Sequence, residues 1–245
     1  MSEPMLAIDA GNTRVKWGVR AGGGWLATGA AAVADHGSLR AQLQGVGAQA
    51  SVAVVSNVAG AATADGIADV LSGLGFLLHW FAASPVCGGV VNRYDEPQQL
   101  GPDRWAALIG ARSRFEGACV VANCGTATTI DALTPDGEFI GGVIAAGVDL
   151  MRDALMQRVP ALRGAPGRFA LFPRNTADAI ASGAVYAAAG AIVGVRRRLK
   201  EWTGATPRIV LTGGAAGHVV PQLIGQVDVV EHLVLEGLVA AMAGA

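Results

Sequence analysis

The stretch Asp9-Ala10-Gly11-Asn12-Thr13 ends the first apolar run of the chain, and a similar stretch, Asn123-Cys124-Gly125-Thr126-Ala127-Thr128-Thr129, ends another apolar run further on. Asp9 aligns with Asn123 and Gly11 with Gly125, and each pair is separated by 114 residues. Each stretch forms a loop between two strand-like runs. The recurrence predicts an internal duplication that gives two similar lobes facing one another.

Both loops have the residue types that hold phosphate groups. A central glycine lets the backbone approach a ligand closely, and backbone N–H groups together with Thr and Asn side chains can cradle a phosphate. Two such loops would form a clamp for a polyphosphate. A single loop of this kind is equally typical of a tight β-hairpin, so the interpretation depends on the recurrence.

Strand-like and helical patterns alternate along the chain, which is typical of an α/β protein. Strands are expected at Met5–Ala10, Val15–Val19, Ser51–Ser56, Phe76–Phe81, Cys119–Asn123, Thr128–Leu133, Phe139–Ile144 and Arg208–Thr212. The clearest helical patterns cover Ala59–Leu74, Pro102–Phe115, Gly147–Arg158 and Thr176 to about Trp202. We expect the lobes to meet near residues 115–118, with an N-terminal lobe of residues 1–116 and a C-terminal lobe of residues 117–245.

Composition narrows the class of protein. Hydrophobic residues make up 52% and charged residues 15% of the 245 residues, which indicates a compact globular chain. The net charge of −1 and a single short basic run at 196–200 argue against nucleic acid as a partner. Three cysteines without a Cys-x-x-Cys spacing are typical of a reducing compartment. The N-terminus shows no secretory signal, and the apolar stretch at 183–195 is shorter than a bilayer requires, so we expect a cytoplasmic protein without a membrane span.

Four elements together resemble the type III pantothenate kinases. They are Asp9-x-Gly11-Asn12-Thr13, Gly101-Pro102-Asp103-Arg104, Gly125-Thr126-Ala127-Thr128-Thr129 and Gly141-Gly142-x-Ile144. The resemblance implies two duplicated ribonuclease H-like lobes of the actin-like ATPase superfold. It also implies transfer of the γ-phosphoryl group of ATP to the primary hydroxyl of pantothenate, the first step of coenzyme A biosynthesis, in a homodimer that uses Mg²⁺ and a monovalent cation, K⁺ or NH₄⁺.

The resemblance makes Asp103 the catalytic base and places Gly101, Pro102 and Arg104 beside it in the pantothenate site. A positioned carboxylate can accept the proton of the attacking hydroxyl. Gly-Pro-Asp is also a common way to begin a helix, so without the phosphate loops the helix start would be the preferred interpretation. The Arg104 guanidinium is implied to bind the carboxylate of pantothenate, although an arginine is by default a solvated charge.

Two further residues match positions that contact the substrate in the family. Tyr94 precedes Gly101 at the spacing found there, but a tyrosine packed beneath a loop is about equally expected. Thr176 lies in Asn175-Thr176-x-Asp178, which is also typical of a helix N-cap. The two roles of Thr176 are compatible, because a helix N-terminus can bind a polar group of a substrate.

ATP is implied to bind the first loop, the second loop and a glycine turn. The residues concerned are Asp9, Ala10, Gly11, Asn12, Thr13, Arg14, Val15, Lys16, Thr126, Gly213 and Gly214. Asp9 is implied to organise the water shell of Mg²⁺. Gly213 and Gly214 resemble the turn at which adenosine approaches the backbone, although an ordinary helix entry has the same sequence features.

The chain departs from the family pattern at two positions. Asn123 stands where relatives carry an aspartate that helps to hold a monovalent cation, so the affinity or identity of that cation is expected to differ. Ala146 stands where a proline often precedes Gly147, which affects the stiffness of that loop and removes no catalytic group.

Two other functions fit parts of the pattern. Another small-molecule kinase of the same superfold would share the phosphate loops, but the Gly101–Arg104 element argues against it. A non-catalytic nucleotide-binding regulator would not need Asp9, Asp103 and Thr126. The small residues along Thr176–Trp202 favour close approach of a second helix and support the homodimer, unless that helix is buried within its own lobe.

Overall fold

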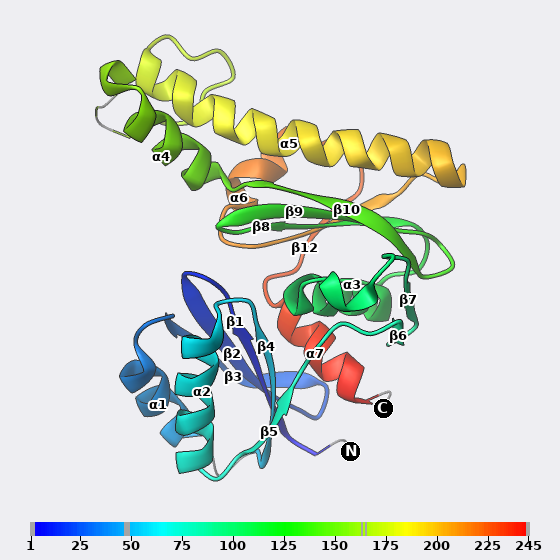
Figure 1. The fold of residues 1–245 in the computed structure, drawn as a ribbon. Coiled ribbons are helices and arrows are strands. Elements are labelled where there is room, and N and C mark those ends of the chain that lie inside the picture. Colours follow the sequence, from blue (N-terminus) through cyan, green and yellow to red (C-terminus); the bar gives the residue numbers. More distant parts are fainter. Residues whose placement is uncertain (1–2, 47–49, 163, 165, 244–245) are drawn as a thin grey trace. The chain divides into compact units, whose positions relative to one another are not determined.

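The computed structural model describes residues 3–46, 50–162, 164 and 166–243, and Figure 1 shows its elements. The chain divides into two compact units. The first comprises Met1–Phe115 together with His232–Ala245, and the second comprises Glu116–Glu231.

The first unit contains a five-stranded sheet with the order β3-β2-β1-β4-β5. Its strands are β1 (Met5–Ala10), β2 (Arg14–Ala21), β3 (Gly24–Ala32), β4 (Val52–Asn57) and β5 (Leu77–Trp80). The central strand β1 pairs antiparallel with β2 and parallel with β4. The carboxyl ends of β1 and β4 therefore lie side by side, and this is the edge at which loops can form a site.

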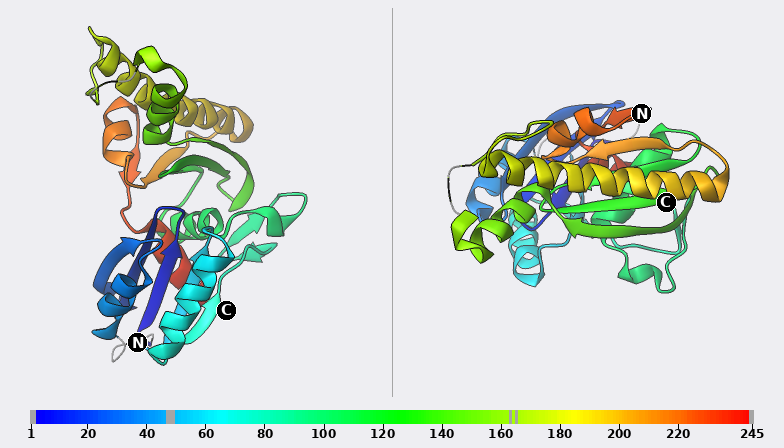
Figure 2. Two further views of the ribbon diagram at one scale, coloured as in Figure 1. Left: turned by 60° about the vertical axis from the view of Figure 1, so that its left-hand side comes forward. Right: turned by 90° about the horizontal axis from the view of Figure 1, so that it is seen from above.

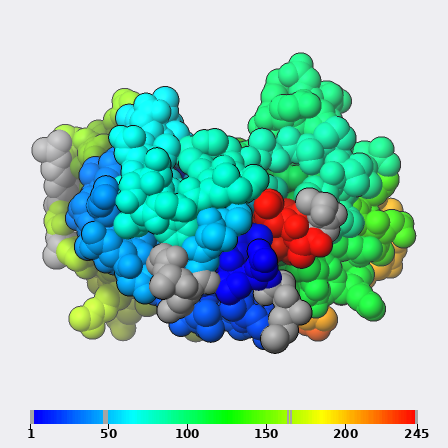
Figure 3. All heavy atoms as spheres, turned by 90° about the horizontal axis from the view of Figure 1, so that it is seen from below, coloured from blue at the N-terminus to red at the C-terminus, as the bar shows by residue number. Residues whose placement is uncertain are grey.

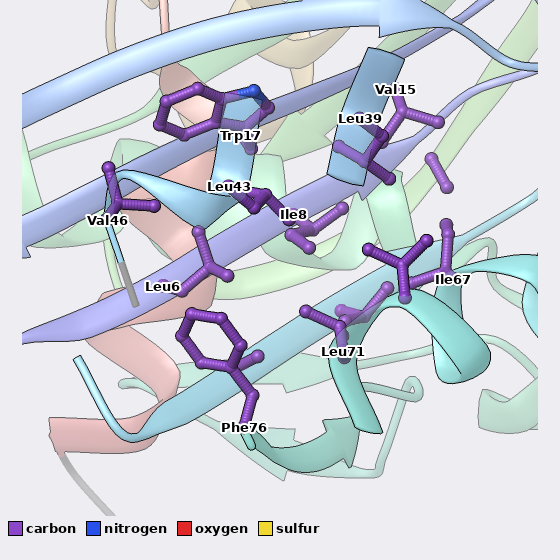
Figure 4. Packing of buried hydrophobic residues seen from close by; sticks show 14 of the residues in the cluster. Leu6, Ile8, Val15, Trp17, Leu39, Leu43, Val46, Ile67, Leu71 and Phe76 are labelled. Atoms are coloured by element: carbon purple, nitrogen blue, oxygen red, sulfur yellow. The ribbon is translucent and has the colours of Figure 1, made fainter. Parts of the chain in front are cut away.

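One face of this sheet carries the main apolar core of the unit. Leu6 and Ile8 pack there with residues of α1 (His36–Gln44) and α2 (Ala61–Gly73), as Figure 4 shows for the core side chains. Side chains alternate between the faces of a strand. Asp9 of β1 and Ser56 of β4 therefore point to the opposite face.

That opposite face is covered by α3 (Pro102–Arg114) and α7 (Leu233–Ala243). The two helices touch backbone to backbone, because a side chain on Gly237 would overlap the carbonyl of Ala106 and one on Gly110 would lie 2.5 Å from the carbonyl oxygen of Leu233. A salt bridge of 2.8 Å joins Arg114 of α3 to Glu236 of α7. In Figure 3 the atoms of α7 (red) lie against those of the first strand (blue).

The position of α7 corrects the expected domain division. Residues 117–245 were expected to form one lobe, but His232–Ala245 belong to the first unit. The physical reason is the close glycine packing of α7 on α3, together with the contact of α7 with β1 and β4. The division between Phe115 and Glu116 lies within the interval expected from the sequence.

Strands of the second unit repeat the topology of the first. They follow the order β12-β11-β8-β9-β10, with β8 (Cys119–Cys124) antiparallel to β9 (Ala127–Leu133) and parallel to β11 (Arg208–Thr212). The outer strands are β10 (Glu138–Ala146) and β12 (Val227–Val229). Numbered from its own first strand, each unit has the order 3-2-1-4-5 with the same strand directions, so the predicted duplication is present in the fold.

Helix α5 (Thr176–Thr203) lies across β8 and β9 of the second unit, as Figures 1 and 2 show, and α4 (Val148–Arg158) packs beside it. The Asn175 side chain caps its start by accepting a hydrogen bond from the Asp178 N–H, and Gly204 ends it with a φ of 73°. Only about a third of its most apolar stretch is buried. By length and composition it could cross a membrane, contrary to the expectation from its central stretch, but core helices of soluble proteins also pass this test.

Every strand and helix expected from the sequence is present, with ends shifted by a few residues. Several elements were missed, among them β3, α1, β6 (Val86–Cys87), β7 (Val90–Asn92), β12, α6 (Ala216–Val219) and α7. The missed strand β3 is rich in Gly and Ala and lacks a clear alternation of large apolar residues. Helix α7 is apolar on nearly every side, so it shows no helical period.

Candidate active site

Three polar side chains form a row across the first sheet. Asp9 is the register partner of Lys16 on β2 and of Ser56 on β4, so all three point to the face covered by α3 and α7. Asp9 is partly exposed, but its Oδ1 atom is buried and has no hydrogen-bond partner in the described part of the chain.

The Asp9 carboxyl group has a pKa raised to about 7. Burial is the main cause, the negative charge of Asp103 adds to it, and the positive charge of Lys16 opposes it. The two carboxylates are therefore close enough to repel each other within the first unit. A cation beside them would relieve both the repulsion and the cost of burial.

Asp103 lies in the first turn of α3, which begins at Pro102 after the cap residue Gly101. A side chain at Gly101 would lie 2.7 Å from the Asp103 carboxylate, so glycine leaves room for the carboxylate to fold back over the helix start. Burial raises the pKa of Asp103, while backbone N–H groups and the Arg104 charge oppose the rise. Gly-Pro-Asp thus begins a helix, as the simpler interpretation predicted, and also presents a partly buried carboxylate with increased proton affinity.

Arg104 is buried, with 6% of its surface exposed, and is not the solvated charge expected by default. Its Nη1 atom donates a 3.0 Å hydrogen bond to the hydroxyl of Tyr94, and its guanidinium lies 5.7 Å from the centre of that ring. The structure therefore brings Tyr94, Asp103 and Arg104 together in the first unit.

Asn92 holds the loop that carries Tyr94, and it was not among the residues predicted for the site. Its side chain donates to the carbonyl of Pro97 and accepts from the N–H of Tyr94. The signal that could have identified it is an asparagine two residues before the tyrosine, since such side chains often bond to a nearby backbone N–H group.

The first loop is a tight turn closed by a hydrogen bond from the Gly11 N–H to the Arg14 carbonyl. The side chains of Asn12, Thr13 and Arg14 are exposed. Those of Ala10 and Val15 are buried in the apolar core, so only their backbone groups could contact a nucleotide.

The second loop and the glycine turn meet within the second unit. Gly213, with a φ of +98°, lies so near β8 that a side chain there would approach the Asn123 Oδ1 atom to 2.7 Å and the Cys124 backbone to 2.5 Å. The Ala215 N–H donates to the Cys124 carbonyl, and the Gly147 N–H donates to the Thr126 carbonyl. Asn123, Thr126, Gly213 and Gly214 therefore form one local cluster.

Thr176 is the first residue of α5 and lines a cavity of about 210 Å³ in the second unit. Arg152, Met156, Leu162 and Ile180 also line it. Thr176, Thr126 and Gly213 thus belong to one unit, whereas Asp9, Asp103, Arg104 and Tyr94 belong to the other.

Among the described residues, no three His, Cys, Asp or Glu side chains come together as a set of metal ligands. Mg²⁺ that binds with ATP needs no such set, because it keeps several waters and takes other ligands from the phosphates. The buried, unpartnered Oδ1 atom of Asp9 and the repulsion from Asp103 fit a hydrated cation at this point. The Asn123 amide oxygen is a suitable ligand for a monovalent cation.

Comparison with known proteins identifies close relatives. A family model described as type III pantothenate kinase matches residues 5–198. A curated type III pantothenate kinase of Aromatoleum aromaticum is 48% identical over 237 residues, which cover 96% of each chain. One of Nitrosospira multiformis is 42% identical over 240 residues, which cover 98% of this chain and 91% of the relative.

Solved structures agree on the fold. Component A of the (R)-2-hydroxyglutaryl-CoA dehydratase of Acidaminococcus fermentans is similar with a TM-score of 0.57 and 16% identity, covering 99% of this chain and 98% of that one. The activator of the 2-hydroxyisocaproyl-CoA dehydratase of Clostridium difficile, with bound ADPNP, has a TM-score of 0.51 and 13% identity, covering 98% and 94%. The chain therefore has the actin-like ATPase fold that the sequence predicted.

The raised pKa of Asp9 predicts that Asp9→Asn stabilises the fold as pH rises. Because the folded-state pKa lies above the unfolded value, the stability due to protonated Asp9 is present at low pH and is lost as pH rises through about 7. The variant keeps a neutral side chain throughout. We expect little difference in free energy of unfolding at pH 4 and a gain of about 2 kcal/mol at pH 8, where partial exposure reduces the full effect. Urea unfolding at both pH values measures it, and a difference that does not change with pH would contradict the assignment.

Proposed function

Since the chain belongs to the type III pantothenate kinase family, which makes it an ATP-dependent kinase acting at the first step of coenzyme A biosynthesis, we propose that Asp103 and Asp9 carry its chemistry. The observation that carries this proposal is the approach of these two carboxylates, from the start of α3 and the end of β1, close enough for one to raise the pKa of the other. Two neighbouring carboxylates can divide the work, one as a base and one toward a cation.

Asp103 acts as the general base. Its carboxylate accepts the proton of the primary hydroxyl of pantothenate while the oxygen attacks the γ-phosphorus of ATP, and ADP leaves with the electrons of the broken bond. The product is 4′-phosphopantothenate. Burial supports this role, because a raised pKa brings proton affinity nearer to the working pH.

Arg104 and Tyr94 bind the substrate. The guanidinium is buried and held by the Tyr94 hydroxyl, so it is fixed in one position before pantothenate arrives. A guanidinium can bind a carboxylate such as that of pantothenate in a bidentate manner. Gly101 and Pro102 shape the adjacent helix start, and Thr176 contributes a polar group from the start of α5.

The first unit offers ATP the backbone N–H groups of residues 10–14, the side chains of Asn12, Thr13 and Arg14, and the positive charge of Lys16. The second unit offers Thr126 for a phosphate and the turn at Gly213 and Gly214 for adenosine. Mg²⁺, when bound through water at Asp9, neutralises charge on the phosphates. Asn123 offers a neutral oxygen to K⁺ or NH₄⁺, which supports weaker or less selective binding than an aspartate would give.

ADP formation by purified protein with ATP and Mg²⁺ should depend on pantothenate. The expected specificity follows from the buried Arg104 guanidinium, whose planar group is suited to bind the carboxylate of pantothenate. Pantothenate should stimulate ADP release strongly, whereas pantothenol, which has the same hydroxyl and no carboxylate, should be a poor acceptor. ADP release that does not depend on pantothenate and responds to a sugar would exclude this acceptor. No ADP release with any acceptor would favour a regulator.

The cation site is tested by titrating activity with K⁺ and NH₄⁺ in the parent protein and in Asn123→Asp. An unaltered cation dependence in the variant would exclude the site.

A homodimer in the cytoplasm is the form that we propose for the active enzyme. Large apolar side chains are exposed on several elements of the second unit: Val143, Ile144, Leu150, Leu155, Leu171, Phe172, Tyr186 and Val193. On α5, Gly183, Gly190 and Gly194 have no neighbour within 4 Å of an added side chain. A second copy that packs its own α5 there would bury this surface with two-fold symmetry.

Gly190→Arg on α5 should convert the dimer to a monomer, because the added side chain would occupy the space of the partner helix. Glu201→Arg is the matched control, since it introduces the same residue at an exposed position near the end of α5. Sedimentation equilibrium at assay concentration measures the mass. A fully active monomeric parent would contradict the proposal.

Mixed dimers of Asp103→Asn with Thr176→Arg should recover activity if the two copies share a pantothenate pocket, and no recovery would place each pocket within one chain.

A further inference from the structure

Ser56, near the end of β4, is a buried hydroxyl that the function described so far does not use. None of its surface is exposed, and its Oγ atom has no hydrogen-bond partner among the residues that the structure describes. A buried polar group without a partner destabilises a fold, and alanine would fill nearly the same space without that cost. The hydroxyl of Ser56 is therefore not explained by packing and points to another role.

Asp9, which lies beside Ser56 on the next strand, has a buried oxygen that lacks a hydrogen-bond donor. Asp9 is its register partner on the neighbouring parallel strand, so both side chains point to the same face of the sheet. The Asp9 Oδ1 atom is likewise buried and lacks a partner in the described part of the chain. One group can donate a hydrogen bond and the other can only accept when ionised, and neighbouring strands lie about 4.8 Å apart.

The second unit has a hydroxyl at the position equivalent to Ser56. Thr212 on β11 is the register partner of Asn123 on β8, as Ser56 is of Asp9. A hydroxyl thus stands at the equivalent place in both units. The Thr212 Oγ1 atom donates to the carbonyl of Glu231 at 3.3 Å, whereas the Ser56 hydroxyl has no such backbone acceptor. It is left available to Asp9.

We propose that Ser56 is a positioning residue for Asp9, donating a hydrogen bond from its hydroxyl to the buried Oδ1 atom when Asp9 faces a cation. This bond fixes the carboxylate and leaves the second oxygen to orient the water shell of Mg²⁺. Carboxylates that serve a metal are commonly held by a further hydrogen bond of this kind, and its loss weakens metal affinity. The inference rests on the role of Asp9 in the proposed function.

The test compares ADP binding with and without Mg²⁺ by calorimetry in the full-length protein. Ser56→Ala should weaken Mg·ADP binding by about tenfold or more and leave metal-free ADP binding unchanged. Ser56→Thr keeps the hydroxyl, as Thr212 does in the other unit, and should keep most of the parent's affinity. If the alanine variant does not fold, Ser56→Cys takes its place as a variant of similar size with a much weaker donor.

Asp9→Asn separates failure of the inference from failure of its premise. It should remove the effect of Mg²⁺ on ADP binding, and Ser56→Ala should add nothing further in that background. If Asp9→Asn leaves the Mg²⁺ effect intact, the role of Asp9 is wrong and the inference falls with it. If Asp9→Asn abolishes the Mg²⁺ effect while Ser56→Ala changes nothing, or lowers metal-free and Mg²⁺-dependent affinity equally, the inference about Ser56 alone is overturned.

Discussion

The alternation of side chains along β1 is the constraint on which the site depends. Leu6 and Ile8 must face α1 and α2 to form the core, and this sends Asp9 to the other face of the sheet. That face is covered by α3, which carries Asp103 in its first turn. The approach of the two carboxylates is therefore a consequence of core packing, and the repulsion between them can be tolerated only where a cation or a proton compensates it.

Asp103 lies at the start of α3, and the packing of α7 against α3 holds this helix on the sheet. Glycines at 110 and 237 allow the helix backbones to touch, and the Arg114–Glu236 salt bridge fixes their exposed ends. The last segment of the chain thus contributes to the unit that contains the proposed base, although the family model matches only residues 5–198. The second unit repeats this arrangement, with Asn123 and Thr212 on the strands equivalent to those of Asp9 and Ser56.

Much of this could be predicted from the sequence. The recurrence of the two glycine loops indicated two equivalent lobes, and the repeated strand order confirms them. The resemblance to the kinase family placed Asp103, Arg104 and Tyr94 in one site, and all three lie together. The packing of α7 in the first unit could not be predicted, because contacts between residues far apart in sequence leave no periodic signal. Ser56 was missed for a related reason: its importance lies in the strand register and in the lack of a partner, and neither is visible in a lone serine of an apolar run.

The central claim is that two neighbouring carboxylates have different tasks, and a paired measurement of turnover against Mg²⁺ concentration tests it most directly. Asp103→Asn should lower kcat by about 10²–10⁴-fold at saturating pantothenate, with the Mg²⁺ requirement of nucleotide binding unchanged. Asp9→Asn should instead raise the concentration of Mg²⁺ and ATP needed for half-maximal rate. The account would be contradicted if Asp103→Asn turned over at nearly the parent's rate, or if both variants altered the same kinetic constant to the same extent.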